Sequence, residues 1–259
     1  MRYWLAIVLF ASAACAEDSY FPDAVLRWGF PGYTGTASSN QIIHNAGKSS
    51  YALTSFGSNR PAAALYYEAE TKAISFSNAV GASDTSCSFH WITRSPDMEL
   101  QAYSLGMWVY WNAVANNYVA ILCKLANGDP FTGGGGGNTS LFFGMDPANK
   151  LRLVVRDSSD HEMLGPVLPA AKWMWLGASV GGGAATLYID GVGVATNASL
   201  FTPPLTYNTA TNYDYTFSVY TRSGGNPYNF GGRLASFVVV PRKLTDSEMR
   251  LLYLEAPRP

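Results

Sequence analysis

Residues 186–194 read Thr-Leu-Tyr-Ile-Asp-Gly-Val-Gly-Val, and this stretch decides the fold of the chain. One apolar run leads into Asp190-Gly191, and a second apolar run leads out of it. An Asp-Gly pair between two such runs is the strongest short-range signal of a β-hairpin, because both turn residues must adopt positive φ. We therefore predict antiparallel strands on both sides of this turn.

Period-two alternation of apolar side chains extends the prediction to other parts of the chain. The apolar members of these segments are Leu26, Trp28 and Phe30; Leu105, Met107, Val109 and Trp111; Leu151, Leu153 and Val155; and Leu187 and Ile189. Helical periodicity is confined to residues 245–255, where Thr245 and Glu248 form a capping box. The apolar stripe of that helix is Met249, Leu252 and Tyr253. The pattern predicts an all-β protein with one short C-terminal helix that lies against the sandwich.

The order of these segments carries more information than any one of them. The C-terminal half contains, in sequence, Trp173-Met174-Trp175, the Asp-Gly hairpin, Gly231-Gly232-Arg233-Leu234 before an apolar run at 237–240, and the capped helix. The N-terminal half contains apolar strands at 26–30, 104–111 and 118–124. This order resembles the laminin-G-like domain of the concanavalin A-like lectin and glucanase superfamily, over residues 24–255. The resemblance implies a concanavalin A-like jelly-roll β-sandwich of two antiparallel sheets.

The same resemblance assigns five tryptophans to the core of the domain. They are Trp28, Trp108, Trp111, Trp173 and Trp175. We expect these side chains to be mainly structural.

Residues 1–16 have the three parts of a secretory signal peptide. Arg2 supplies the positive charge, residues 4–10 the apolar stretch and Ala14-Cys15-Ala16 the small-residue cleavage site. The apolar run is too short to span a bilayer. The alternatives are a buried N-terminal strand and a lipoprotein signal centred on Cys15, although Ser12 stands where a larger aliphatic residue is usual.

We expect a mature protein that begins at Glu17, with residues 17–259 forming a single domain that is secreted or held at a cell surface. Charged residues make up 14% of the chain and the net charge is −1, so the basic surface that nucleic acids require is missing. Aromatic residues also reach 14%. Large rings suit half-buried sheets, which agrees with an exported β-protein.

Two cysteines remain after signal removal, Cys87 and Cys123, each in an expected strand. In an oxidising compartment they would form one disulfide; the alternative is two buried thiols that act as small apolar residues. Asn138 and Asn197 begin glycosylation sequons, which matter only in a host that glycosylates.

The sequence offers no complete set of catalytic groups. Hydrolases of the superfamily need two carboxyl groups close together on one strand, and the nearest match is Glu68-Ala69-Glu70. A solvated edge strand explains that pair equally well. The three histidines, His44, His90 and His161, lack the spacing of a metal site. We therefore expect no enzymatic activity.

Calcium is bound by many members of the superfamily, but the acidic positions that hold it are absent here. Ala235-Ser236 stand after Gly232-Arg233-Leu234 where an acidic residue is common, and residues 34–38 lack the Asp-x-Ser-Gly pattern. An acidic group at Asp157, Asp160 and Glu162 is interpreted as a polar hairpin turn. We assign no cofactor, and calcium is the one ion that the resemblance leaves open.

Binding is the function that the loops favour. Long loops are expected at 32–50, at 127–138 with five glycines at 133–137, and at 202–215. Aromatic faces and Asn or Asp groups on loops recognise sugars. The candidate ligand-binding residues are Tyr207, Asn208, Asn212, Tyr213, Asp214, Tyr215, Asn226 and Tyr228. The alternative is that these tyrosines cover the edge of the sandwich.

We thus predict a secreted, non-catalytic binding module for a glycan or a surface protein. The first alternative is a self-associating structural subunit of an extracellular assembly. The second is a glycoside hydrolase or polysaccharide lyase of the same fold.

Overall fold

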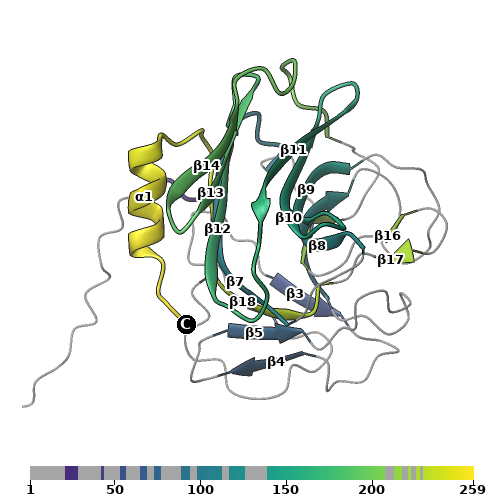
Figure 1. The fold of residues 1–259 in the computed structure, drawn as a ribbon, viewed down its shortest axis with the longest axis vertical. Coiled ribbons are helices and arrows are strands. Elements are labelled where there is room, and N and C mark those ends of the chain that lie inside the picture. The colour runs from purple at the N-terminus through teal and green to yellow at the C-terminus, as the bar shows by residue number, and fades with distance from the viewer. Residues whose placement is uncertain are drawn as a thin grey trace, which may run out of the picture.

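The computed structural model describes residues 21–28, 42–43, 53–56, 65–68, 73–76, 89–93, 98–112, 117–125, 139–207, 213–217, 221–222, 226–227 and 230–259. These residues form two antiparallel sheets and one helix (Figure 1). Sheet A has the order β14 (Val192–Asn197), β13 (Ala184–Ile189), β12 (Met174–Gly181), β7 (Tyr103–Trp111), β18 (Gly232–Val240), β5 (Ala73–Phe76) and β4 (Leu65–Glu68). A further strand, β1 (Leu26–Trp28), pairs with the second half of β18.

Sheet B faces sheet A across the core. Its order is β11 (Asp160–Val167), β10 (Lys150–Arg156), β9 (Thr139–Met145), β8 (Val119–Leu125), β15 (Tyr213–Phe217), β6 (Phe89–Thr93), β3 (Leu53–Phe56) and β2 (Ile42–Ile43). A separate two-stranded ribbon pairs β16 (Thr221–Arg222) with β17 (Asn226–Pro227). The predicted β-sandwich with one short C-terminal helix is confirmed.

The Asp-Gly hairpin forms as the sequence predicts. Asp190 and Gly191 connect β13 to β14 with φ values of 49° and 74°. A side chain at Gly191 would meet the Cβ atom of Tyr253 at 2.9 Å. The turn therefore needs glycine for two reasons, its left-handed backbone and the close approach of the helix.

The main core lies between the two sheets and uses the predicted alternation. Leu105, Met107, Val109 and Trp111 point inward from β7, with at most 2% of each exposed. The inward residues of β10 are Leu151, Leu153 and Val155, all fully buried. Alternate residues of the same strands point to the outer faces, so each sheet has one face free to carry a helix or a site.

Helix α1 (Asp246–Glu255) covers part of the outer face of sheet A. Thr245 caps it, and Thr245 and Glu248 form the predicted capping box. Met249 and Leu252 are buried against Trp108 and Trp175 of the sheet, while Tyr253 is partly buried. The Tyr188 hydroxyl, on β13, donates to Asp246 at 2.7 Å, and burial together with that carboxylate raises the pKa of Tyr188.

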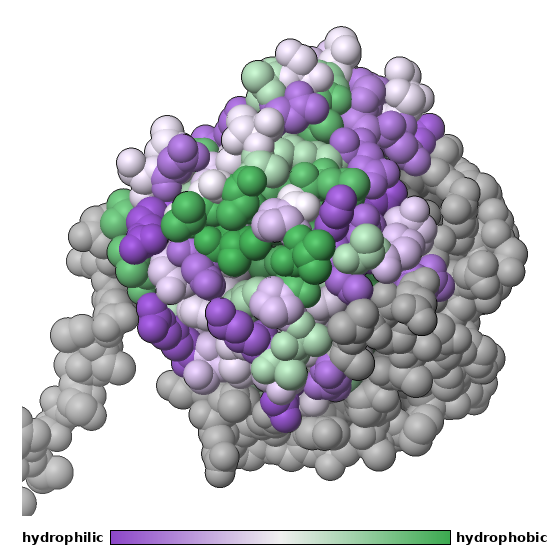
Figure 2. Space-filling model, viewed as in Figure 1, coloured by the Kyte–Doolittle hydropathy of each residue, from purple (hydrophilic) through white to green (hydrophobic). Residues whose placement is uncertain are grey.

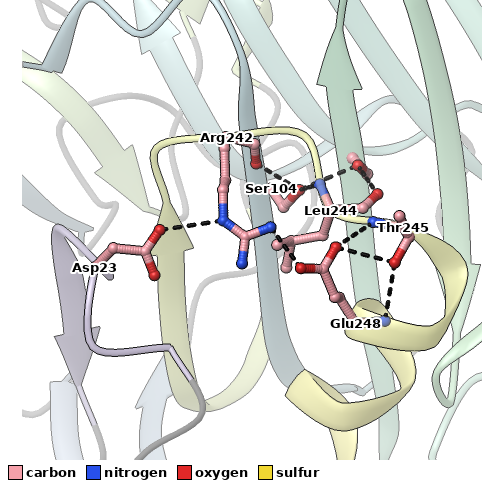
Figure 3. Close-up of polar contacts among 7 residues, drawn as sticks. Asp23, Ser104, Arg242, Leu244, Thr245 and Glu248 are labelled. Carbon is pink, nitrogen blue, oxygen red and sulfur yellow. Dashed lines mark hydrogen bonds and ion pairs between the residues drawn. The ribbon is translucent and has the colours of Figure 1, made fainter.

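A polar cluster fastens the approach to α1 onto the sandwich (Figure 3). Arg242 lies between two carboxylates, 3.2 Å from Asp23 and 2.6 Å from Glu248. The buried Ser104 hydroxyl accepts from the backbone N–H of Leu244 at 2.8 Å. These contacts join the first described segment, a central strand and the helix.

None of the helices in the described residues is long and apolar enough to cross a membrane.

Candidate functional site

The segment expected to carry the ligand is partly a strand. Tyr213, Asp214 and Tyr215 belong to β15, which lies between β8 and β6 in the middle of sheet B. The predicted loop from 202 to 215 therefore ends earlier, because Tyr213 begins a strand. Asn226 lies in β17, whereas Asn208, Asn212 and Tyr228 lie outside the described residues.

Tyr207 contributes to the scaffold. Its hydroxyl donates to the backbone carbonyl of Leu100, and the ammonium group of Lys124 lies 4.5 Å from the centre of its ring. The ring is partly buried against the main core. These contacts of Tyr207 favour the alternative interpretation, that tyrosines of this segment cover the sandwich.

The acidic group at Asp157 forms the predicted turn, between β10 and β11. The Asp157 carboxylate accepts from the backbone N–H groups of Thr202 at 2.8 Å and Ser159 at 2.9 Å. With the nearby His161 ring, these bonds hold the pKa of Asp157 well below its usual range. Ser159 and Asp157 both approach Nε2 of His161, at 3.2 and 2.8 Å. A Ser-His-Asp relay uses one ring nitrogen for each partner, so this arrangement is not one.

The remaining acidic, histidine and cysteine candidates are spread over several strands or lie outside the described residues. Glu68 ends β4, an outer strand of sheet A, whereas Glu70 lies outside the described residues, as do His44, Cys87 and Asn138. His90 lies in β6. Within the described part of the chain, no group of three or more His, Cys, Asp or Glu side chains could hold a metal ion.

Asn197 is exposed, and its side chain accepts from the backbone N–H of Ser199 at 2.9 Å.

Cys123 is buried on the outer face of sheet B, beside Phe142 and Val154. Burial raises the pKa of its thiol. In the strand ladder, Cys123 of β8 lies opposite Thr216 of β15. Strand β15 separates β8 from β6, and β6 is the strand that begins two residues after Cys87. The disulfide therefore stays a prediction.

The structure brings together a different group, on the outer face of sheet A. Trp173 directly precedes β12, Tyr110 lies on β7 and Arg233 on β18, and the strand register places all three in one line across the sheet. The rings of Trp173 and Tyr110 are 5.6 Å apart with a tilt of 56°, and the Arg233 guanidinium lies 4.9 Å from the centre of the Tyr110 ring. All three side chains are partly exposed. We call these residues the outer row.

A parallel line of residues explains why the outer row is open. Trp175 and Trp108 lie opposite each other one step along the same strands. Both are almost fully buried, because Tyr253 of α1 packs against both rings. The helix ends at Glu255, and the indole N–H of Trp108 donates to the carbonyl of Ala256 at 3.3 Å. Helix α1 thus covers the line of Trp175 and Trp108 and stops short of the outer row.

The segment before β12 holds Trp173 in place. The indole N–H of Trp111 donates to the carbonyl of Pro169 at 2.6 Å, and the backbone N–H of Ala171 donates to the carbonyl of Trp111 at 2.9 Å. Both bonds fasten the 169–171 segment to the end of β7. Two exposed polar residues flank the row in the chain, Lys172 before Trp173 and Asn112 after Trp111.

The side chains of the outer row are two aromatic rings and a guanidinium, a combination that suits binding. Partly exposed aromatic faces next to polar donors accept the C–H faces and hydroxyl groups of sugars. Trp108, Trp111 and Trp175 occupy core positions as predicted, and Trp173 is partly buried against the same cluster as Trp108 and Trp175 while part of it stays exposed. No local signal in the sequence separates Trp173 from Trp175, because both are tryptophans at alternate positions of one segment.

A family model described as the concanavalin A-like lectin/glucanases superfamily, of the laminin-G type, matches residues 84–250. No curated protein matches the sequence at a comparable level of significance.

Solved structures show the same fold at low identity. A Trypanosoma rangeli sialidase in complex with sialic acid matches with a TM-score of 0.60 and 13% identity, over 90% of this chain and 33% of the sialidase. The binding domain of Botulinum neurotoxin DC, in complex with rat synaptotagmin II, matches with a TM-score of 0.59 and 12% identity, over 90% of this chain and 51% of that chain. A structure titled as a receptor binding domain matches with a TM-score of 0.62 and 13% identity, over 90% and 51%. This chain thus spans between a third and a half of those proteins.

Proposed function

Because the chain belongs to the laminin-G-like family of the concanavalin A-like lectin/glucanases superfamily, we propose that it is a secreted, non-catalytic module that binds carbohydrate at the outer row. The observation that carries the proposal is the partly exposed pair of Trp173 and Tyr110 on a rigid sheet. Rings held by a sheet are already ordered before binding, so little side-chain entropy is lost when a ligand stacks on them.

The tilt of the two rings limits what can stack there. Planes at 56° cannot both lie under one flat face, so one ring stacks and the other supports it. Arg233 lies against the face of Tyr110, which leaves Trp173 as the stacking ring. The proposal therefore names Trp173 as the contact residue and Tyr110 as its support.

The candidates predicted between Tyr207 and Tyr228 offer a second location for the same function. Tyr213 and Tyr228 are the residues of that set that test it, since Tyr207 belongs to the scaffold. A surface protein is the other class of partner in this proposal. The neurotoxin binding domain, in complex with rat synaptotagmin II, shows that a related fold can bind a protein.

A glycan array separates these locations. We expect Trp173→Ala to abolish binding and Tyr213→Ala and Tyr228→Ala to leave it unchanged. Leu254→Ala, at a side chain 60% exposed on α1, is the matched control and should bind as the wild type does. Loss of binding in the tyrosine variants alone would move the site to the segment between Tyr207 and Tyr228. A blank array for the wild type would reject carbohydrate binding.

The catalytic alternative rests on Glu68 at an outer strand and on sialidases among the related folds. Release of reducing ends from β-glucans, lost on Glu68→Gln, would support it, and our proposal expects none.

Export and the Cys87–Cys123 disulfide belong to the same proposal. Thiol titration of the unfolded mature protein without reductant should find no free thiol if that disulfide exists, and two if it does not.

A further inference from the structure

An apolar surface lies where the ends of the two sheets meet. β11, the outer strand of sheet B, runs beside β14, the outer strand of sheet A. Four of their aliphatic side chains are well exposed: Val192 (54%), Val194 (37%), Leu164 (41%) and Val167 (60%). Figure 2 shows hydrophobic surface gathered over these strands, with hydrophilic side chains around it. We call these four residues the edge patch. Contiguous apolar surface of this kind marks an interaction site.

The edge strands of the two sheets differ in the features that discourage pairing with another chain. β11 carries Asp160, Glu162 and Pro166, while β4 has four residues and ends in Glu68, and β2 has only two. Charges, prolines and short length all discourage pairing with another chain. β14 has six residues, Val-Gly-Val-Ala-Thr-Asn, with neither a charge nor a proline. Among the described residues, its backbone makes no hydrogen bond outside its ladder with β13.

One irregularity in β14 decides what kind of contact it can make. The register with β13 shifts between the pairs Leu187–Ala195 and Tyr188–Gly193, which leaves Val194 as an extra residue. A bulge interrupts a regular ladder, so another strand cannot pair along the full length of β14. Packing of the aliphatic side chains must therefore supply most of the contact.

We propose that the edge patch is the contact surface between two copies of this chain, packed against each other about a two-fold axis with the β14 strands antiparallel. A two-fold contact is isologous, so aliphatic side chains of one copy meet those of the other. β14 carries no charge, so its apposition with itself brings no like charges together, and the two carboxylates of β11, Glu162 and Asp160, form ion pairs with Arg152 and Arg156. A charged partner would find no complementary charge on β14. This inference goes beyond carbohydrate binding and does not depend on it.

The size of the surface indicates how strong the contact is. A strand of six residues is about 20 Å long, and the two sheets are about 10 Å apart. A face of these dimensions covers on the order of 200 Å² in each copy before its flanking side chains are counted, whereas stable interfaces bury about 1,200–2,000 Å² in total. We therefore expect a dimer in equilibrium with monomer. At a glycan-bearing surface, pairing would join two outer rows and strengthen binding by avidity.

Sedimentation equilibrium between micromolar and millimolar concentration tests the dimer. The protein is produced without N-glycosylation, because Asn197 ends β14. We expect the average mass of the wild type to rise toward that of a dimer. Val194→Lys should weaken association by about tenfold or more, because the contact would then bury unpaired charge. Leu254→Lys, at a more exposed position on α1 (60% against 37% for Val194), is the control and should associate as the wild type does.

Three results would overturn the proposal. They are a wild type that stays monomeric at millimolar concentration, a Val194→Lys variant that associates normally, and a Leu254→Lys variant that is weakened equally. Thermal unfolding checks that each variant is folded. If Val194→Lys does not fold, Val192→Lys replaces it, because that side chain is 54% exposed.

Discussion

The Asp190 carboxylate accepts a hydrogen bond from the backbone N–H of Trp175 at 2.9 Å, and the backbone N–H of Asp190 donates to the Trp175 carbonyl at 2.8 Å. The turn that decides the fold is therefore tied to the start of β12, the strand that carries Trp173 at its entrance. Two hydrogen bonds thus connect the Asp-Gly turn to the strand that follows Trp173 of the outer row.

Substitution of Asp190 tests this connection. Asp190→Ala removes the acceptor of the Trp175 N–H and places alanine at a φ of 49°, so we expect the free energy of unfolding to fall by about 1–3 kcal/mol. Asp190→Asn keeps an acceptor oxygen and tolerates positive φ, so its cost should stay below about 1 kcal/mol. Urea unfolding measures both. An equal loss in the two variants would show that the hydrogen bond and the backbone angle are unimportant.

The capping box gives a prediction for the helix that covers Trp108 and Trp175. Thr245→Ala removes the hydroxyl that accepts from the Glu248 N–H, and we expect a loss of about 1 kcal/mol, equivalent to about 2–4 °C in Tm. Ser247→Ala, at an exposed position of the same turn, is the control and should leave Tm nearly unchanged. Scanning calorimetry would contradict the prediction if both variants melted together.

Asp157 makes stability depend on pH in the acidic range. The backbone N–H groups of Thr202 and Ser159 and the His161 ring lower its pKa in the folded state. The unfolded chain then binds the proton more readily, so this contribution is present above the unfolded value of about 3.9 and is lost as pH falls through the folded pKa. Asp157→Asn should be less stable than the wild type at pH 7 and should lose less between pH 5 and pH 2, as followed by urea unfolding.

A nearby carboxylate provides the control for that experiment. Asp160 forms an ion pair with Arg156 at 2.7 Å, but its side chain is 45% exposed. Surface pairs contribute little, so Asp160→Asn should leave the stability at pH 7 almost unchanged. If both variants shift the acid unfolding curve to the same extent, the buried turn has no special part in it.

The sequence predicts the features that depend on neighbours in the chain. The Asp-Gly turn, the capping box and the period-two cores of β7 and β10 all follow from local backbone preferences. The pairing of strands that are far apart in the chain does not follow from local backbone preferences. That β15 lies between β8 and β6 depends on long-range pairing, which no local pattern encodes.

The exposure of Trp173 is missed for the same reason. Trp173 and Trp175 look alike in the sequence, both being tryptophans at alternate positions of one segment. Only the register of β12 against β7 and the end of α1 at Glu255 distinguish them, because the helix reaches Trp175 and not Trp173. A candidate site made by what a helix leaves uncovered requires the three-dimensional structure.

Gly106 of β7 has no side chain, and the Trp175 ring occupies the space that a side chain would fill. A Cβ atom at Gly106 would lie 2.1 Å from the Trp175 ring, which is fully buried. Gly106→Ala must displace that ring and with it Tyr253 of α1, so we expect a loss of about 1–3 kcal/mol or more. Gly193→Ala is the matched control in another strand of the same sheet, since its nearest neighbour would be 3.5 Å away, and it should cost less than about 0.5 kcal/mol. Tryptophan fluorescence during urea unfolding follows both variants, and an unchanged midpoint for Gly106→Ala would mean that Trp175 can move without loss.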